Sequence, residues 1–182
     1  MNKEKPDVIR KPTSRRGWLI IGLVAALLLA VSIFESLRYF KPVTAFRTGA
    51  ALEEETLPDG SGVLLNQRSR LTLSDEWKTA EHREAWLEGE GFFTTVRTDD
   101  TNGVTIHTPR FDVVAFQAKF NLFNRNNTIR AWLQEGEAYI LSHDAKPKKV
   151  LFEPGDLVEY RKRQFIIRKD SGQGIIKWTS KK

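Results

Sequence analysis

The chain has 182 residues and no cysteine, with 29 Lys and Arg against 23 Asp and Glu and a formal net charge of +6. This length allows one domain with its own hydrophobic core. The absence of cysteine excludes a disulfide scaffold, a thiolate metal site and a lipid-attachment cysteine. Six basic and two acidic residues precede Trp18, so +4 of the charge belongs to the first 17 residues, which argues against a nucleic-acid-binding surface on the rest.

Residues 18–34 form an uncharged apolar segment, at the short end of what crosses a hydrocarbon core as a helix. We predict a transmembrane helix over residues 18–36, preceded by a basic cytoplasmic tail over residues 1–17. Basic residues beside a span hold their end in the cytoplasm. The expected location is therefore the inner (cytoplasmic) membrane, with a single pass, the N-terminus in the cytoplasm and the bulk of the chain in the periplasm.

A cleaved signal peptide is the alternative for this segment. Its apolar run is longer than the ~7–15 residues usual in signal peptides, and only Ala30-Val31-Ser32 resembles a cleavage site. We therefore expect the anchor to be retained. A linker over residues 37–45, one β domain over residues 46–178 and a short tail over residues 179–182 complete the predicted organisation.

The first strong turn signal after the anchor is Leu57, Pro58, Asp59, Gly60 and Ser61. Proline fixes φ, and glycine supplies the backbone conformations that other residues avoid. Residues 124–127 predict a hairpin loop, and residues 153–156 around Gly155 predict another turn.

Short segments with strand patterns lie between these turns. They cover residues 63–65, 70–74, 111–116, 120–122, 128–133, 165–167 and 175–176. Many short strands with little helical periodicity predict an all-β domain, which is a sandwich, a barrel or a β-solenoid.

A near-repeat stands out within these strands. Residues 85–93 carry Ala-Trp-Leu followed by Gly89 and Glu90, and residues 131–140 carry Ala-Trp-Leu followed by Gly136 and Glu137, with one extra residue in the second copy. Recurrence suggests that one supersecondary unit is used twice. We interpret both Gly-Glu pairs as structural turns, and we expect the fold to need both glycines.

The sequence offers little catalytic chemistry. His82, His107 and His143 are isolated in the sequence and lack metal-ligand spacing, so neither a metal site nor a cofactor is expected. Glu88 and Glu90 are two residues apart, as in a carboxylate pair for glycoside hydrolysis, but the repeat favours a structural role. We predict that the chain is not an enzyme. Most of its aromatic residues should fill the core, and one or two exposed ones would mark a docking surface.

Three patterns together resemble the FecR family. Residues 57–61 resemble the opening of the family's periplasmic domain. Residues 83–93, which include Gly89 and Glu90, resemble its Arg-x-Val-x-Leu-x-Gly-Glu-Ala-x-Phe signature. Residues 150–156, which include Gly155, resemble its late Leu-x-Pro-Gly-Glu turn.

The resemblance implies an inner-membrane regulator, or anti-sigma factor, that passes a receptor's signal to an extracytoplasmic-function sigma factor. It also implies an all-β, solenoid-like periplasmic domain without cofactor or catalysis. The expected partners are an envelope protein and, through the cytoplasmic end, a sigma factor. Full-length family members carry several tens of residues before the span, whereas this sequence has 17. The alternative is a membrane-anchored β module that binds a glycan, the cell wall or an envelope protein without a role in transcription.

Overall fold

The computed structural model describes residues 21, 24–29, 44–75, 77, 83–97, 103–162 and 164–180. The chain divides into two compact units, Met1–Pro42 and Val43–Lys182. In the first unit the described residues are helical and exposed. No helix in the described part of the chain is long and apolar enough to cross a membrane. Most of the predicted segment 18–36 lies outside the described residues, as does His82.

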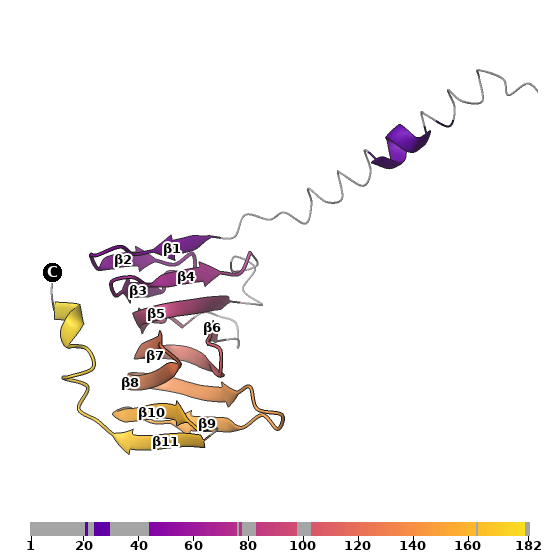
Figure 1. Ribbon diagram of the computed structural model, residues 1–182. Helices are drawn as coiled ribbons and strands as arrows, with labels where there is room; N and C mark the ends of the chain where they lie inside the picture. Colours follow the sequence, from indigo (N-terminus) through magenta and orange to yellow (C-terminus); the bar gives the residue numbers. More distant parts are fainter. Residues whose placement is uncertain are drawn as a thin grey trace, which may run out of the picture. The chain divides into compact units, whose positions relative to one another are not determined.

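The second unit is predominantly β, as predicted, and its described strands form one open sheet (Figure 1). The strands are β1 (Ala45–Arg47), β2 (Glu53–Thr56), β3 (Gly62–Leu65), β4 (Arg70–Leu73), β5 (Glu84–Thr94), β6 (Val104–His107), β7 (Phe111–Arg125), β8 (Thr128–Ser142), β9 (Lys149–Phe152), β10 (Asp156–Arg161) and β11 (Gln164–Lys169). A short 3₁₀ helix, η2 (Lys177–Ser180), follows. The main path of the sheet runs β1-β4-β5-β6-β7-β8-β10-β11, and among the pairs of described strands only β5–β6 is parallel.

The predicted hairpin at residues 124–127 is confirmed, and it is tight. Strands β7 and β8 pair up to Arg125 and Thr128, which leaves only Asn126 and Asn127 in the turn. Both asparagines have positive φ, 51° and 59°. Two consecutive positive φ values are the requirement of the two-residue turn that matches strand twist, and asparagine tolerates them well.

The predicted strand at residues 175–176 is wrong. The backbone N–H groups of Ile175 and Ile176 both donate to the carbonyl of Gly172, at 2.9 Å. Gly172 has a φ of +75°. The chain therefore turns at this point and continues into η2, because these donors are used locally and cannot join a sheet ladder.

The interior of the sheet holds the hydrophobic core. Alternate residues of β3, β4, β5, β7 and β8 are fully buried, and the rings of Phe93 and Phe120 stack with centroids 5.0 Å apart. Burying one such side chain contributes roughly 1.5–3 kcal/mol. Every residue of the core cluster lies between Leu57 and Tyr160, within the second unit.

The extra residue of the second repeat copy is a β-bulge in β8. Lys119 pairs with Glu135 and Phe120 pairs with Leu133, so Gln134 has no cross-strand partner. Residues 129, 131 and 133 are buried before the bulge, and residues 138, 140 and 142 are buried after it. The inserted residue thus changes which positions face the core, so that every second side chain still points inward after the strand bends.

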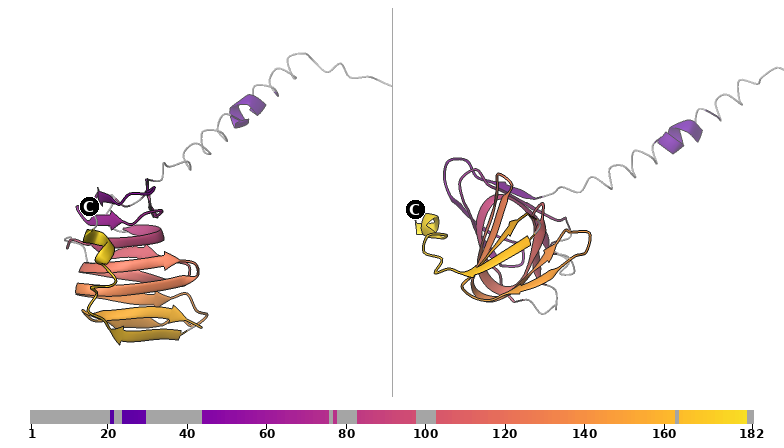
Figure 2. Two further views of the ribbon diagram at one scale, coloured as in Figure 1. Left: turned by 60° about the vertical axis from the view of Figure 1, so that its left-hand side comes forward. Right: turned by 60° about the horizontal axis from the view of Figure 1, so that its bottom comes forward.

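After β11 the chain turns back along the outer surface of the sheet. Residues 170–180, which we call the C-terminal strap, run past several strands toward the β1 end of the unit, as both views show (Figures 1 and 2). The strap is held by Trp132, whose Nε1 donates to the carbonyl of Asp170 at 3.1 Å. The strap therefore covers part of a sheet face that would otherwise be exposed.

Candidate functional site

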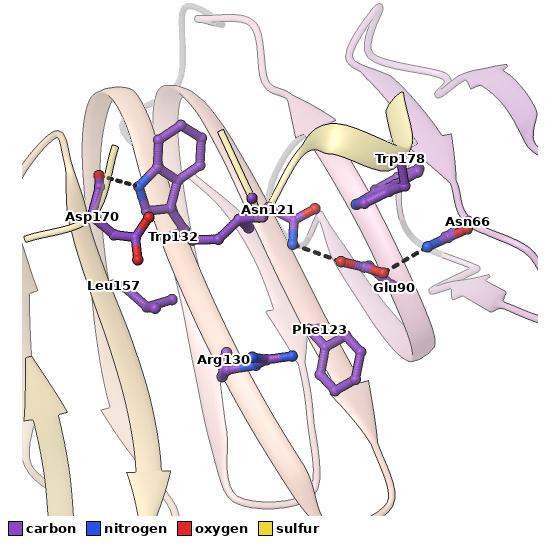
Figure 3. Close-up of a pocket in the computed structure, with 11 residues that line it drawn as sticks. Asn66, Glu90, Asn121, Phe123, Arg130, Trp132, Leu157, Asp170 and Trp178 are labelled. Atoms are coloured by element: carbon purple, nitrogen blue, oxygen red, sulfur yellow. Dashed lines mark hydrogen bonds between the residues drawn. The ribbon is translucent and has the colours of Figure 1, made fainter. Parts of the chain in front are cut away.

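The strap and the outer face of the sheet enclose a cavity of about 390 Å³. Cross-strand register brings its floor together: Asn121 is opposite Trp132, which is opposite Leu157. In the next row, Glu90 is opposite Phe123, which is opposite Arg130. Asn66 closes one side of the cavity, and the strap contributes Asp170, Gly174, Ile175 and Trp178 (Figure 3).

Glu90 is the most unusual residue of this cavity, because it is an acidic residue that is only 8% exposed. Asn66 Nδ2 donates to one carboxylate oxygen at 2.6 Å, and Asn121 Nδ2 donates to the other at 3.0 Å (Figure 3). No cation among the described residues forms an ion pair with Glu90. A buried charge needs such hydrogen bonds to offset its lost hydration.

Arg130 lies on the same floor. Its guanidinium carbon sits 4.5 Å from the centroid of the Phe123 ring, in a cation–π contact. This contact keeps the guanidinium beside the cavity.

Two buried polar atoms at the cavity lack a hydrogen-bond partner among the described residues. They are the amide oxygen of Asn121 and the indole N–H of Trp178. Asn121 is 2% exposed, and in Figure 3 its amide lies on the side that faces Trp178. Nearly all buried polar groups in proteins are paired. These two atoms have almost no exposed surface, so another polar group can reach them only when the strap moves aside.

A second polar cluster lies on β5, β6 and β7. Nδ1 of His107 and Nε2 of His143 each lie 2.8 Å from the same oxygen of Asp112. Glu84 lies 3.7 Å from the other ring nitrogen of His107. His107 and His143 are far apart in the sequence, but the β6–β7 pairing and the β8–β9 turn bring both to one carboxylate.

These contacts shift two pKa values in opposite directions. The hydrogen bond to Asp112 raises the pKa of His107 above 6.5, against the opposing effect of burial. Burial by itself would raise the pKa of Asp112, but the hydrogen bonds from the two histidines outweigh it and lower the pKa below 3.8. No group of three or more His, Asp or Glu residues in the described ranges is arranged to hold a metal ion.

The turn residues predicted from the sequence have structural contacts. Leu57 is buried and Ser61 is fully buried, while Pro58 is exposed. Asp59 accepts hydrogen bonds from the backbone N–H and the hydroxyl of Ser61, at 3.0 and 2.9 Å. Asp59 also pairs with the buried guanidinium of Arg83 at 3.5 Å. Gly60 has a φ of +86°, so this turn uses the conformation that glycine permits.

The two repeat glycines are alike, whereas the residues beside them differ. Gly89 and Gly136 have φ values of +109° and +91°. A β-carbon on Gly89 would overlap Ser69, in the turn before β4, and one on Gly136 would overlap Gln117 and Ala118 of β7. Glu90 is buried beneath the strap, whereas Glu137 is exposed. The two copies of the repeat therefore share a backbone bend, but they do not share a binding site.

The remaining sequence candidates lie outside the cavity. Gly155, with a φ of +84°, forms the β9–β10 turn, and its N–H donates to the carbonyl of Leu133 at 2.8 Å. Glu88 is exposed while Glu90 is buried, so the two do not form a pair facing one cleft. Trp86 is 45% exposed and stacks on His107, with ring centroids 4.9 Å apart.

Sequence reasoning missed most of the cavity. Asn121 and Arg130 belong to no motif, and Asn66 and Phe123 were not linked to them from the sequence. Strand pairing brings Asn121, Phe123 and Arg130 together, and Asn66 follows directly after β3. Trp178 was visible as a late aromatic, but its place depends on the path of the strap.

Together these features define an all-β, single-sheet domain with two polar clusters on its surface. The family model described as FecR protein matches residues 44–139, which is more than half of the chain. This chain therefore belongs to the FecR family.

The fold is similar to that of two crystal structures named as a candidate anti-sigma factor from Parabacteroides distasonis. The first, at 2.50 Å resolution, has a TM-score of 0.68 and 19% identity, and the match covers 77% of this chain and 66% of that one. The second, at 1.65 Å resolution, has a TM-score of 0.67 and 20% identity, with 76% and 65% covered. At this identity the likeness shows the fold. The chain spans about two thirds of the length of these structures, and no curated protein matches it.

Proposed function

We propose that this FecR-family chain regulates a sigma factor through protein–protein contact, with its β domain in the periplasm and an N-terminal anchor in the inner membrane. The observation that carries the proposal is the family match over residues 44–139, which includes both Gly-Glu pairs. The apolar segment at residues 18–34, with its preceding basic residues, supports the anchor and its orientation.

The end of the sheet that carries β9 and β11 suits contact with an envelope partner. Each of these strands pairs with one other described strand, so each leaves an open edge. Leu151 on β9 is 72% exposed, and Ile166 and Ile167 on β11 are 47% and 46% exposed. Open edges and exposed apolar side chains are the features that strand addition by a partner uses.

In-cell crosslinking of the tagged full-length chain, followed by mass spectrometry, tests the proposal. We expect a sigma factor among the crosslinked proteins, and we expect it to disappear when residues 2–16 are replaced by a scrambled tail of the same composition. The scrambled tail keeps the charge that sets topology, so it controls for misinsertion. Envelope proteins alone, unaffected by the exchange, would instead support a periplasmic binding module without a role in transcription.

Membrane orientation is tested separately. Alkaline phosphatase fused after residue 182 should be active, because it folds in the periplasm, whereas the same enzyme fused before residue 1 should be inactive. The opposite pattern would contradict the proposed topology.

A further inference from the structure

The cavity beneath the strap has walls that can both donate and accept hydrogen bonds. The acceptors are the carboxylates of Glu90 and Asp170 and the amide oxygen of Asn121. The donors are the guanidinium of Arg130 and the indole N–H of Trp178. A ligand that fits these walls must itself carry both donors and acceptors.

The charges around the cavity disfavour a charged ligand. Glu90 is buried without an ionic partner among the described residues, whereas Asp170, which also lines the cavity, pairs with Arg168 at 3.2 Å. An anion would therefore meet the uncompensated charge of Glu90. Arg130 is held against the Phe123 ring at the floor, so a cation would meet a guanidinium. In a partly buried site such like-charge contacts are costly, which leaves a neutral polar ligand.

The two unpaired atoms indicate which functional group the ligand carries. Asn121 Oδ1 needs a donor, and Trp178 Nε1 needs an acceptor. A hydroxyl group supplies both at once, because its oxygen accepts one hydrogen bond while its proton donates another. The buried position of Asn121, 2% exposed, makes such a bond worth more than one on the surface.

Apart from the amide of Asn66, which donates to Glu90, the rest of the lining is apolar. Phe123, Trp132, Leu157 and Ile175 contribute it, and the first two are aromatic. The C–H groups of a sugar ring pack against such side chains while its hydroxyls reach the polar ones. A volume of about 390 Å³ is at the lower end of the range of small-molecule sites.

We propose that this cavity binds a neutral saccharide ring. Glu90 and Asn121 accept hydrogen bonds from its hydroxyls, Trp178 donates one, and the strap forms one wall of the site. This goes beyond sigma-factor regulation and does not depend on it. Among the described residues, all hydrogen bonds between the strap and the sheet involve Asp170, the first residue of the strap. Its N–H donates to the carbonyl of Gly155, its carbonyl accepts from Trp132, and its carboxylate accepts from Arg168. The part of the strap beyond Asp170 can therefore lift to admit the ring.

Calorimetric titration of the full-length chain tests the proposal, in a detergent without a sugar headgroup. The probes are D-glucose, its charged relatives D-glucosamine and D-glucuronate, and sorbitol, which has the hydroxyls but no ring. We expect saturable glucose binding with a Kd of about 1 mM. The two charged sugars and sorbitol should bind at least about tenfold more weakly, a difference of about 1.4 kcal/mol.

A pair of variants controls for the site. Trp178→Phe keeps an aromatic ring in the strap and removes only the N–H, so it should raise the Kd for glucose about threefold to tenfold. Trp77→Phe removes a second buried N–H without a partner among the described residues, from a side chain that does not line the cavity. It should leave the Kd unchanged.

No saturable heat with glucose would overturn the proposal. So would equal affinity for sorbitol, or an equal effect of both tryptophan variants. A chain that crosslinks to a sigma factor and yet binds no sugar would retain the proposed function and lose only this site.

Discussion

Gly172 lies directly on the indole ring of Trp132. A β-carbon on Gly172 would come within 2.0 Å of Cζ2 of the ring, and the residue has a φ of +75°. A side chain at this position is therefore excluded both by space and by backbone conformation. This contact fixes where the strap begins to cross the sheet.

Gly172→Ala should release the strap. We expect a loss of about 1–3 kcal/mol in the free energy of unfolding, from backbone strain and overlap. The tryptophan emission of the folded chain should shift to the red as Trp132 becomes exposed. Gly174→Ala is the matched control, since nothing lies within 4 Å of a β-carbon there and its φ is not positive. If both variants melt and emit alike, Gly172 does not anchor the strap.

Gly136→Ala should destabilise the domain more than Gly60→Ala. The φ values are similar, +91° and +86°. A β-carbon on Gly136 would lie 1.9 Å from the carbonyl oxygen of Gln117, whereas one on Gly60 would meet nothing within 4 Å. We expect a loss of about 1 kcal/mol at Gly60 from the dihedral alone, and at least about 3 kcal/mol at Gly136. Urea unfolding measures the free energy of unfolding of both variants. Equal losses would mean that β7 and β8 move apart at Gly136 without an energetic cost.

The two glutamates of the repeat should differ in their effect on stability. Glu90→Ala leaves the amide groups of Asn66 and Asn121 without their acceptor, so it should cost about 2–4 kcal/mol. Glu137→Ala, at an exposed position, should change the free energy of unfolding by less than about 0.5 kcal/mol. Thermal unfolding measures both effects. Equal losses of stability for the two variants would contradict the prediction, because they would show that the burial of Glu90 makes no difference.

The contacts of Asp112 predict a pH-dependent contribution to stability. The pKa of His107 is raised, so its contribution is complete below 6.5 and is lost as the pH rises through the folded-state pKa. The pKa of Asp112 is lowered, so its contribution is present above 3.8 and is lost as the pH falls through the folded-state pKa. The stability difference between the native chain and Asp112→Asn should therefore be largest between pH 3.8 and 6.5.

Urea unfolding at a series of pH values measures this difference. Glu135→Gln is the control, because Glu135 is an exposed carboxylate paired with Lys119 and is not in contact with either histidine. Its stability difference from the native chain should vary little over the same range. If the stability difference between the native chain and Asp112→Asn did not vary with pH, the predicted contribution of the histidine contacts would be wrong.

Local signals were enough to predict the β class and several turns. Proline, glycine and asparagine act on their own backbone, so the turns at Gly60, Asn126 and Gly155 follow from residue type. The pairing order of strands far apart in the chain does not follow from such signals. A sandwich, a barrel and a solenoid all remained open for that reason, and the described strands form one open sheet.

The candidate site could not be predicted, because it depends on non-local contacts. Glu90 was visible in the sequence as part of a Gly-Glu pair, but its burial requires the strap, which is some 80 positions later in the chain. His107 and His143 likewise meet only through Asp112. Ile175 and Ile176 have strand-like side chains, yet the local bonds to Gly172 decide their conformation.

The bulge at Gln134 has a consequence for how such domains diversify. One inserted residue lets the second repeat copy keep the positive-φ bend at its glycine, while the inward-facing positions pass from residues 129, 131 and 133 to residues 138, 140 and 142. An insertion of a single codon can thus be accommodated within a long strand without turning its apolar side chains toward solvent. The sequence of one strand can then change in length while the pairing of the other strands is retained.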